Sequence, residues 1–460
     1  MFKRVLVAGR GEIALRVIRA CRELDIETVA IFSEADRASM PAMLATESIC
    51  VGAAPARESY LNMQNIITAA VETGCDALHP CYGFLAENAE FATMCQNSGI
   101  RFIGPSPNVI ARMGSKASAR QAALSAGVPV VPGSDGVVET LQMAAAEADK
   151  IGYPVLIKAT AGGGGRGMRK VFEPSELESA FTSARSEAES AFGNGSVYIE
   201  KLILGPKHIE IQILADSHGN VIHLGERDCS VQRRNQKLIE EAPSKVVDEE
   251  LRKRMGDAAV ACAKYVGYEN AGTVEFVLDN TGNFYFIEMN TRIQVEHPVT
   301  EFVTGVDIVK EQIRIAAGLQ LTNKAEDIRI TGHAIECRIN AEDPSKGFTP
   351  TPSETKFLHL AAGAGVRVDT AIFTGYEPSI YYDSLLAKLI VHGKNRLEAI
   401  RKMRRVLEET IIEGPITNGS LLHLITFDPA FLSGEYTTAF LDENLDKLLQ
   451  ASASVPVKDK

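Results

Sequence analysis

The 460-residue chain carries 48 Lys and Arg against 59 Asp and Glu, and 45% of its residues are hydrophobic. A net charge of −11 argues against nucleic acid as a general partner, and the length suggests roughly three domains. The eight cysteines form no CxxC pair, no apolar run approaches the ~20 residues of a membrane span, and the first predicted strand leaves no room for a signal peptide. We therefore expect a soluble cytoplasmic protein with free thiols and no membrane partner.

The first hundred residues alternate short apolar segments with amphipathic segments. The predicted strands cover 5–8, 29–32, 77–78 and 102–103, and the predicted helices cover 12–24, 62–73 and 87–97. This alternation predicts a parallel, doubly wound sheet. From 197 to 290, closely spaced strands around one long helix near 248–265 indicate an α+β unit with antiparallel pairs. A third mixed unit is expected from about 332 to 445, followed by a frayed tail over 451–460.

The segment Gly9-Arg10-Gly11-Glu12-Ile13-Ala14 fits the dinucleotide-binding pattern G-x-G-x-x-A between a strand and a helix. Glu34, at the end of the next strand, stands where such sites place an acidic residue. One interpretation is nicotinamide or flavin binding. The other is a tight turn that packs the helix against the sheet, and this is favoured because later residues assemble a different nucleotide site.

A glycine cluster follows the predicted strand over 153–158. Lys158 precedes Gly162, Gly163, Gly164, Gly165 and Gly167, and Arg166 lies among them. Glycines let several backbone N–H groups approach one anion, and the two cations add positive charge. No Lys-Ser/Thr pair closes the segment, so it is not a Walker A loop. We favour a mobile lid over phosphates rather than a flexible linker, since linkers seldom adjoin such a strand.

The stretch from Glu288 to Glu296 alternates polar and apolar residues. In an extended chain, one face would carry five polar side chains: Glu288, Asn290, Arg292, Gln294 and Glu296. A solvated strand face is the alternative. However, Glu, Asn and Gln are poor strand formers, so this mixture of acids, amides and a cation favours a binding site.

A hairpin places a second carboxylate beside this stretch. Residues 273–278 and 284–288 flank the turn signal Asp279-Asn-Thr-Gly-Asn283, and their pairing puts Glu275 nearly opposite Glu288. Facing carboxylates repel each other, and a divalent cation would turn that repulsion into binding. With Asn290 the ligand set is all oxygen, which suits Mg²⁺ or Mn²⁺ rather than zinc.

Lys158 with its glycines, and Glu275, Glu288 and Asn290, resemble the ATP-grasp fold. Five separated motifs narrow the resemblance to biotin carboxylase over residues 1 to about 445: residues 10–14, 79–85, 226–237, 288–297 and 332–342. The resemblance implies an α/β and α+β fold. It implies a doubly wound N-terminal domain over 1–114, an ATP-grasp domain over 115–330 with a mobile lid at about 131–203, a mixed C-terminal domain over 331–446, and a tail over 447–460.

The resemblance also implies roles for individual residues. It assigns the ATP phosphates or ribose to Lys116, Lys158, the backbone of Gly163, Gly164 and Gly165, and His208. It assigns the adenine edge to Glu200, Lys201 and Ile203, and further nucleotide contacts to Gln232 and Asn235. It assigns the metal to Glu275, Glu288 and Asn290. It assigns bicarbonate to Lys237, Arg292, Gln294 and the backbone of Val295. Glu296 would be the general base, and Arg338 would meet the ureido oxygen of biotin beside Tyr82.

The implied reaction carboxylates biotin with ATP, Mg²⁺ or Mn²⁺ and bicarbonate through carboxyphosphate. No Met-Lys-Met biotinylation site is present, so we expect biotin on a separate carrier protein. We also expect a separate carboxyltransferase subunit as a partner, and a homodimer of this chain. Acetyl-CoA carboxylase is the first choice of holoenzyme, with two-subunit pyruvate carboxylase or a propionyl-CoA carboxylase as alternatives. An inactive ATP-grasp binding subunit, or another ATP-grasp ligase acting on a carboxylate, would be a different class.

Three positions depart from the pattern of the family. Gly9 stands where Asn is common, Cys81 where Gly is common, and Asn235 where many members have His. The first two fall on predicted tight turns, and the third is expected to alter one nucleotide contact.

Overall fold

The protein, represented by a computed structural model, is described over residues 1–160 and 167–454. Its N-terminal part is a five-stranded parallel sheet in the order β3-β2-β1-β4-β5. The strands are β1 (Arg4–Val7), β2 (Glu27–Ser33), β3 (Glu47–Gly52), β4 (Ala77–His79) and β5 (Arg101–Phe102). The helices are α1 (Gly11–Glu23), α2 (Met40–Leu44), α3 (Met63–Glu72), α4 (Ala89–Asn97), α5 (Pro107–Gly114) and α6 (Lys116–Ser125).

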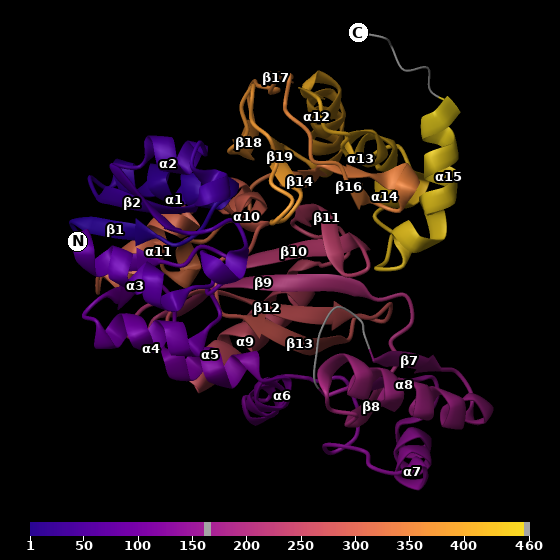
Figure 1. The fold of residues 1–460 in the computed structure, drawn as a ribbon. Helices are drawn as coiled ribbons and strands as arrows, with labels where there is room; N and C mark the ends of the chain where they lie inside the picture. Colours follow the sequence, from indigo (N-terminus) through magenta and orange to yellow (C-terminus); the bar gives the residue numbers. More distant parts are fainter. Residues whose placement is uncertain (161–166, 455–460) are drawn as a thin grey trace.

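Both faces of this sheet are covered by helices (Figure 1). Val5 and Val7 pack in the cluster that contains α1, whereas Leu6 packs in the cluster that contains α3 and α4. A strand buried on both faces needs a continuous apolar run, and β1 has one. The predicted doubly wound sheet is confirmed, while the edge strand β3 was not anticipated.

A second sheet of eight antiparallel strands forms the centre of the molecule (Figure 1). Its order is β13-β12-β9-β10-β11-β14-β19-β18. The strands are β9 (Lys207–Ala215), β10 (Val221–Arg233), β11 (Gln236–Ala242), β12 (Asn270–Leu278), β13 (Phe284–Asn290), β14 (His333–Asn340), β18 (Val366–Thr370) and β19 (Leu385–Gly393). The C-terminal strands thus extend the central sheet instead of forming one of their own. The helices α9 (Glu249–Val266), α10 (His297–Thr304) and α11 (Ile308–Ala316) pack beside it.

Alternation along β9 directs polar side chains to one face of this sheet. Ile209 and Ile211 are buried in the same cluster as Met255 of α9. Because side chains alternate along a strand, His208 and Glu210 point to the opposite face. That face carries the candidate site residues described below.

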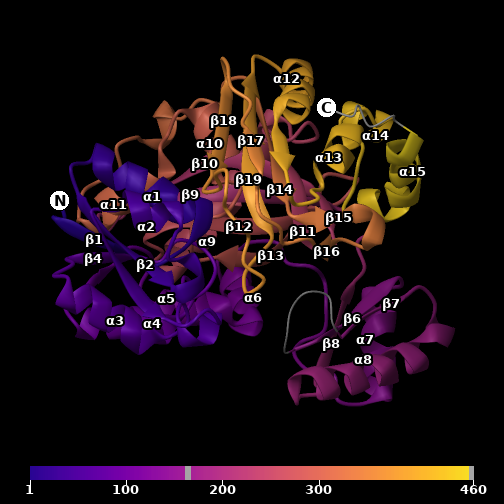
Figure 2. The same ribbon diagram turned by 45° about the horizontal axis from the view of Figure 1, so that its top comes forward.

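A small unit projects away from the rest of the chain (Figures 1 and 2). It contains a three-stranded antiparallel sheet in the order β7-β6-β8, with its own apolar cluster. Its elements are α7 (Leu141–Ile151), β6 (Val155–Ala159), β7 (Met168–Val171), α8 (Leu177–Phe192) and β8 (Val197–Lys201). Because this unit has an apolar cluster of its own, it can move as a cover over a cleft without disrupting the main core.

The C-terminal helices share one apolar cluster with β14 and β19. They are α12 (Arg396–Glu409), α13 (Gly419–Ile425), α14 (Pro429–Ser433) and α15 (Phe440–Ser454). Short strand pairs complete this part: β15 (Glu342–Asp343) with β16 (Thr349–Pro350), and β17 (Phe357–His359) with β20 (Ile411–Glu413). The last helix continues to 454, so the start of the segment expected to be a tail is helical. Among the described residues, no helix has the length and apolarity of a membrane span.

Candidate active site

One cleft of about 1350 Å³ contains every predicted site residue that the structure describes. These residues are Tyr82, Lys116, Lys158, Glu200, Lys201, Ile203, His208, Gln232, Asn235, Lys237, Glu275, Glu288, Asn290, Arg292, Gln294, Val295, Glu296 and Arg338. They come from the N-terminal sheet, the projecting unit and the central sheet. The remaining predictions, Gly163, Gly164 and Gly165, lie outside the described residues.

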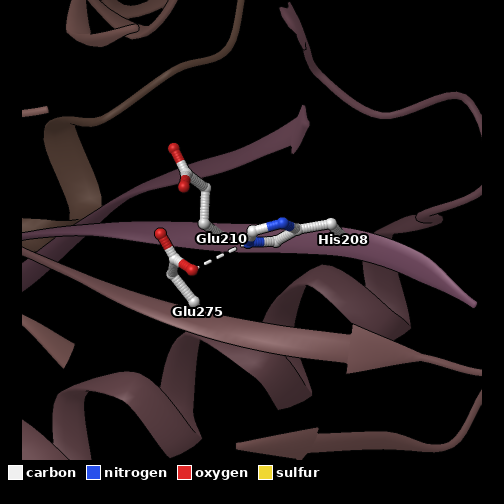
Figure 3. A group of neighbouring side chains, drawn as sticks. All are labelled: His208, Glu210 and Glu275. Carbon is white, nitrogen blue, oxygen red and sulfur yellow. Dashed lines mark hydrogen bonds and ion pairs between the residues drawn. The ribbon is translucent and has the colours of Figure 1, made fainter. Parts of the chain in front are cut away.

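The predicted hairpin is present, and a β-bulge between Glu275 and Phe276 brings Glu275 directly opposite Glu288 where β12 pairs with β13. His208 Nε2 lies 2.9 Å from Glu275 Oε2, and Glu210 points into the same space (Figure 3). Burial would raise the pKa of Glu275, but Lys237 and His208 outweigh burial and lower it. Burial and the neighbouring Glu275 raise the pKa of Glu288, and Lys116 offsets part of that effect. This edge of the cleft therefore favours an added positive charge beside Glu288.

The expected extended face from Glu288 to Glu296 is only partly present. The strand β13 ends at Asn290, residues 291–296 form bends and a turn, and α10 begins at His297. The prediction of a continuous strand was therefore wrong, because the chain leaves the sheet to enter a helix. An alternating sequence is compatible with a continued strand and also with a bent segment, provided that the bends direct every second side chain to the same side.

The bent segment still directs its polar side chains at one point. Asn290 Nδ2 and Gln294 Nε2 donate to Glu275 Oε1 at 2.9 and 3.0 Å. Arg292 donates from Nη1 to Gln294 Oε1 at 2.6 Å and from Nη2 to Asn290 Oδ1 at 3.1 Å. These side chains form a connected polar wall with a guanidinium at its centre, which is a setting for a planar anion.

Lys237 is the cation at the middle of the cleft. Its Nζ lies 2.7 Å from Glu210, 3.1 Å from Glu275 and 2.6 Å from Glu296. Burial would lower the pKa of Lys237, but the three carboxylates raise it well above its usual value. The ammonium therefore stays charged at neutral pH.

A tight turn delivers Lys237 to this place. Arg233 pairs with Gln236 across the β10–β11 hairpin, and the two intervening residues, Arg234 and Asn235, have φ of 48° and 66°. Two central residues with positive φ define a type I′ turn, which Asn tolerates well. Asn235, one of the three departures from the family pattern, thus suits the turn that positions Lys237.

Glu296 is tied to two cations and is almost fully buried. Besides Lys237, it accepts from Arg338 Nη2 at 2.9 Å, and Arg338 Nε donates to Glu240 at 2.6 Å. Burial would raise the pKa of Glu296, but Lys237, Arg338 and Arg227 hold it well below its usual value. Glu296 is therefore ionised at neutral pH and able to accept a proton.

The outer end of the cleft faces the projecting unit. Lys158 on β6 lies 2.5 Å from Glu200 on β8. Lys201 donates its Nζ to the carbonyl oxygens of Gly152 and Tyr153 at 2.8 and 2.9 Å. The Lys201 side chain is engaged with its own unit, and its backbone N–H donates to the Pro132 carbonyl oxygen at 2.7 Å.

Tyr82 belongs to a buried chain of contacts that sequence reasoning did not find. Its hydroxyl donates to Glu12, Glu12 lies 3.1 Å from Lys388 Nζ, and Lys388 donates to the Val295 carbonyl at 2.8 Å. Lys388 is fully buried. A lysine inside the apolar run 385–391 was a signal for it, because such a residue is rarely buried without partners. Glu210 had a similar signal in the alternating run from 207 to 213.

The segment Gly9–Ala14 forms a tight turn that starts α1, with Gly11 at φ +66°. A Cβ at Gly9 would lie 2.5 Å from Cys81 Sγ and 2.7 Å from its Cβ. Cys81 has φ of 59° and is buried. Two departures from the family pattern therefore adjoin each other: the small residue at 9 makes room for the larger one at 81.

Family models match most of the chain. They describe the N-terminal domain of biotin carboxylase over residues 1–110, the ATP-binding domain of the carbamoyl-phosphate synthase L chain over 115–324, and the C-terminal domain of biotin carboxylase over 336–443. The chain belongs to the biotin carboxylase family. The ATP-grasp fold class is thereby confirmed, and the dinucleotide interpretation of Gly9–Ala14 is not favoured.

Biotin carboxylases from distant organisms are similar along their whole length. Biotin carboxylase 1 of Bacillus subtilis is 54% identical over 443 residues, which cover 96% of this chain and 98% of that protein. A pyruvate carboxylase subunit of Methanothermobacter thermautotrophicus is 53% identical, covering 96% and 90%. The biotin carboxylase domain of 2-oxoglutarate carboxylase from Hydrogenobacter thermophilus, a dimer in complex with MgADP, ADP and bicarbonate, is 53% identical with a TM-score of 0.92, covering 97% and 99%.

Proposed function

We propose that this chain is the catalytic biotin carboxylase of a biotin-dependent carboxylase, consuming ATP and bicarbonate to carboxylate biotin on a carrier protein. The observation that carries the proposal is the position of Glu296 between Lys237 and Arg338, beside the wall formed by Arg292 and Gln294. A base, an anion-binding wall and two further cations meet in one cleft. A subunit that only bound ATP would not need a base, an anion-binding wall and two further cations together.

Bicarbonate binds against Arg292, Gln294 and the backbone of Val295, close to Lys237. The cations lower the electrostatic cost of bringing one anion to another. Glu296 accepts the bicarbonate proton as its oxygen attacks the γ-phosphorus of ATP. The bond from that phosphorus to the ADP oxygen breaks, so the products of this step are ADP and carboxyphosphate.

The nucleotide lies between the central sheet and the projecting unit. Lys116, Lys158 and His208 meet its phosphates and ribose, together with the backbone of Gly163, Gly164 and Gly165. The end of β8 and the residues just after it contact the adenine through Glu200, Lys201 and Ile203. Gln232 and Asn235 make further contacts with the nucleotide. Closing the projecting unit over the nucleotide excludes water, which protects an intermediate that water would destroy.

Glu275, Glu288 and Asn290 fit an Mg²⁺ or Mn²⁺ ion. Two carboxyl groups opposite each other favour a positive charge between them, and the raised pKa of Glu288, which results from burial and from Glu275, supports a cation at this position. Such an ion supplies charge neutralisation for the transferring phosphoryl group.

Arg338 holds the ureido oxygen of biotin, and Tyr82 lines the same cleft. Carboxyphosphate breaks down to CO₂ and phosphate beside this point. The phosphate takes the ureido proton, and the ureido nitrogen then forms its new bond to the carbon of CO₂. The guanidinium stabilises the negative charge that appears on the ureido oxygen in this step.

The partners are a biotin carboxyl carrier protein and a carboxyltransferase, and the assembly is a homodimer. Acetyl-CoA carboxylase is the first choice of holoenzyme. A pyruvate carboxylase is the alternative, supported by the similarity to the Methanothermobacter protein; a propionyl-CoA carboxylase is a further one. Purification of the chain from its source with its bound partners, followed by acyl-acceptor assays, separates these choices.

The proposal is tested by measuring ADP release with free biotin as acceptor. We expect ADP release to require bicarbonate, to rise with biotin, and to accompany fixation of labelled bicarbonate into biotin. Carbamoyl phosphate or another product would indicate a different ATP-grasp ligase. ATP binding without turnover would indicate the inactive binding subunit.

A further inference from the structure

We infer that Glu87 is a positioning residue for bicarbonate: it holds the Arg292 guanidinium from the N-terminal part of the molecule. This inference deepens the proposed function and rests on it. Glu87 lies in the connection between β4 and α4, about two hundred residues before its partners in the sequence. It was not among the predicted site residues.

The Glu87 carboxylate makes two kinds of contact. Its Oε2 accepts from Arg292 Nε at 2.9 Å. Its Oε1 accepts from the Thr291 backbone N–H at 3.1 Å and from the Thr291 hydroxyl at 3.5 Å. One side chain therefore fixes both the guanidinium and the backbone bend where the chain leaves β13.

Within the described residues, Glu87 is the hydrogen-bond partner of Arg292 that lies outside its own segment. The other hydrogen-bond acceptors of Arg292 are Asn290, Ile293 and Gln294, all within two residues of it. Local partners move together with the segment, so they orient the guanidinium within that segment only. The contact at Nε fixes the position of the guanidinium relative to the rest of the cleft. It leaves the Nη1 and Nη2 groups free to contact Gln294 and Asn290.

The position of Glu87 is itself well defined by its neighbours in sequence. Leu85 and Ala86 are buried in the N-terminal part of the molecule, Leu85 in the core of its sheet. Asn88 caps α4 by accepting from the Phe91 N–H at 2.8 Å. Because the chain is anchored on both sides of it, Glu87 can act as a fixed support. The same connection carries Tyr82, so it joins the biotin side of the cleft to the bicarbonate side.

Charge and position predict opposite results when Glu87 is changed. As a nearby negative charge, Glu87 weakens the attraction of Arg292 for an anion, so its removal would tighten bicarbonate binding. As a positioning residue, it keeps the Arg292 guanidinium in the orientation that binds bicarbonate, so its removal weakens bicarbonate binding. We expect the second effect to dominate, because small misplacements of a substrate-holding group cost far more than a partly exposed charge contributes.

The test compares Glu87→Gln, Glu87→Ala and Glu87→Asp with the wild-type chain in steady-state kinetics. Loss of a charge-assisted hydrogen bond predicts a rise of roughly tenfold or more in KM for bicarbonate with Gln, and more with Ala. Asp keeps the charge with a shorter reach and should give an intermediate value. The KM for ATP and the thermal unfolding midpoint should stay close to those of the wild type.

Glu90→Gln is the matched control, since Glu90 is exposed and has no polar partner in the described part of the chain. It should leave both KM values unchanged. An unchanged or lowered KM for bicarbonate in Glu87→Gln would overturn the inference, as would a parallel rise in both KM values. Absence of bicarbonate-dependent ATP cleavage in the wild type would instead refute the proposed function, so the two failures are distinguishable.

Discussion

Glu336 lies directly opposite Glu240 where β14 pairs with β11, and both carboxyl groups are fully buried. Neither carboxyl oxygen of Glu336 has a hydrogen-bond partner within the described residues. The charged groups around it are Lys388, Glu240, Arg338 and Glu296. Burial and Glu240 raise the pKa of Glu336 well above its ordinary value, against the effect of Lys388. Glu336 therefore keeps its proton to a higher pH in the folded protein than in the unfolded chain.

This arrangement makes stability depend on pH in a predictable direction. Above pH 4.5 the unfolded chain releases the Glu336 proton while the folded chain keeps it, so folding loses about 1.4 kcal/mol per pH unit up to the raised pKa. Glu336→Gln has no such proton. We expect the thermal unfolding midpoint of this variant, relative to that of the wild type, to increase as pH rises from 5.5 to 7.5. Glu413→Gln, an exposed control, should show no such trend, and a constant difference for Glu336→Gln would contradict the assignment.

The contact between Gly9 and Cys81 predicts coupled substitutions. Gly9→Asn alone should destabilise the protein by about 1–3 kcal/mol, because its Cβ meets Cys81 Sγ. Adding Cys81→Gly removes both the clash and a side chain at positive φ. The double variant should therefore unfold at a higher temperature than Gly9→Asn. Additive effects of the two changes would show that the positions are independent.

The carboxylate pair predicts a selective effect on the metal requirement. Glu288→Gln keeps the size of the side chain and removes the charge opposite Glu275. We expect the Mg²⁺ concentration for half-maximal ATP cleavage to rise by about tenfold or more, and Mn²⁺ to bind more weakly in the presence of ADP. Glu269→Gln, outside the cleft, serves as the control. An unchanged metal requirement would remove Glu288 from the proposed ligand set.

The proposed role of Arg338 predicts different effects on ATP binding and on biotin carboxylation when this residue is changed. Arg338→Ala should leave the KM for ATP within about twofold of the wild type, and depress carboxylation of biotin by about a hundredfold or more. Both quantities follow from parallel assays of ADP release and biotin carboxylation. Arg401→Ala, at an exposed position outside the cleft, is a control that should retain both activities. Equal loss of ATP binding and carboxylation would indicate that Arg338 mainly supports the fold.

Several elements could be predicted from the sequence because local signals determine them. The turn signal at 279–283 sets the register of 276–278 against 284–286, which predicts Glu275 within one residue of Glu288, and a β-bulge between Glu275 and Phe276 completes that pairing. Strand and helix alternation likewise predicted the parallel N-terminal sheet. The order of five motifs predicted the residues that line the cleft.

Long-range contacts explain what the sequence did not reveal. The bend after Asn290 is held by Glu87, and the Val295 carbonyl is held by Lys388. Neither partner is close in sequence to the segment it supports. The residues 288–296 have the same alternating pattern whether the chain continues as a strand or bends, so only tertiary contacts decide between the two paths.

In the proposed reaction, bicarbonate itself attacks the γ-phosphorus while Glu296 takes its proton. This step can be followed with bicarbonate uniformly labelled with ¹⁸O and mass spectrometry of the inorganic phosphate released during biotin carboxylation. Attack by a bicarbonate oxygen predicts one ¹⁸O atom in each phosphate, and Glu296→Gln should abolish the labelled product while ATP still binds. Phosphate without the label would show that water cleaves ATP, and would contradict the account.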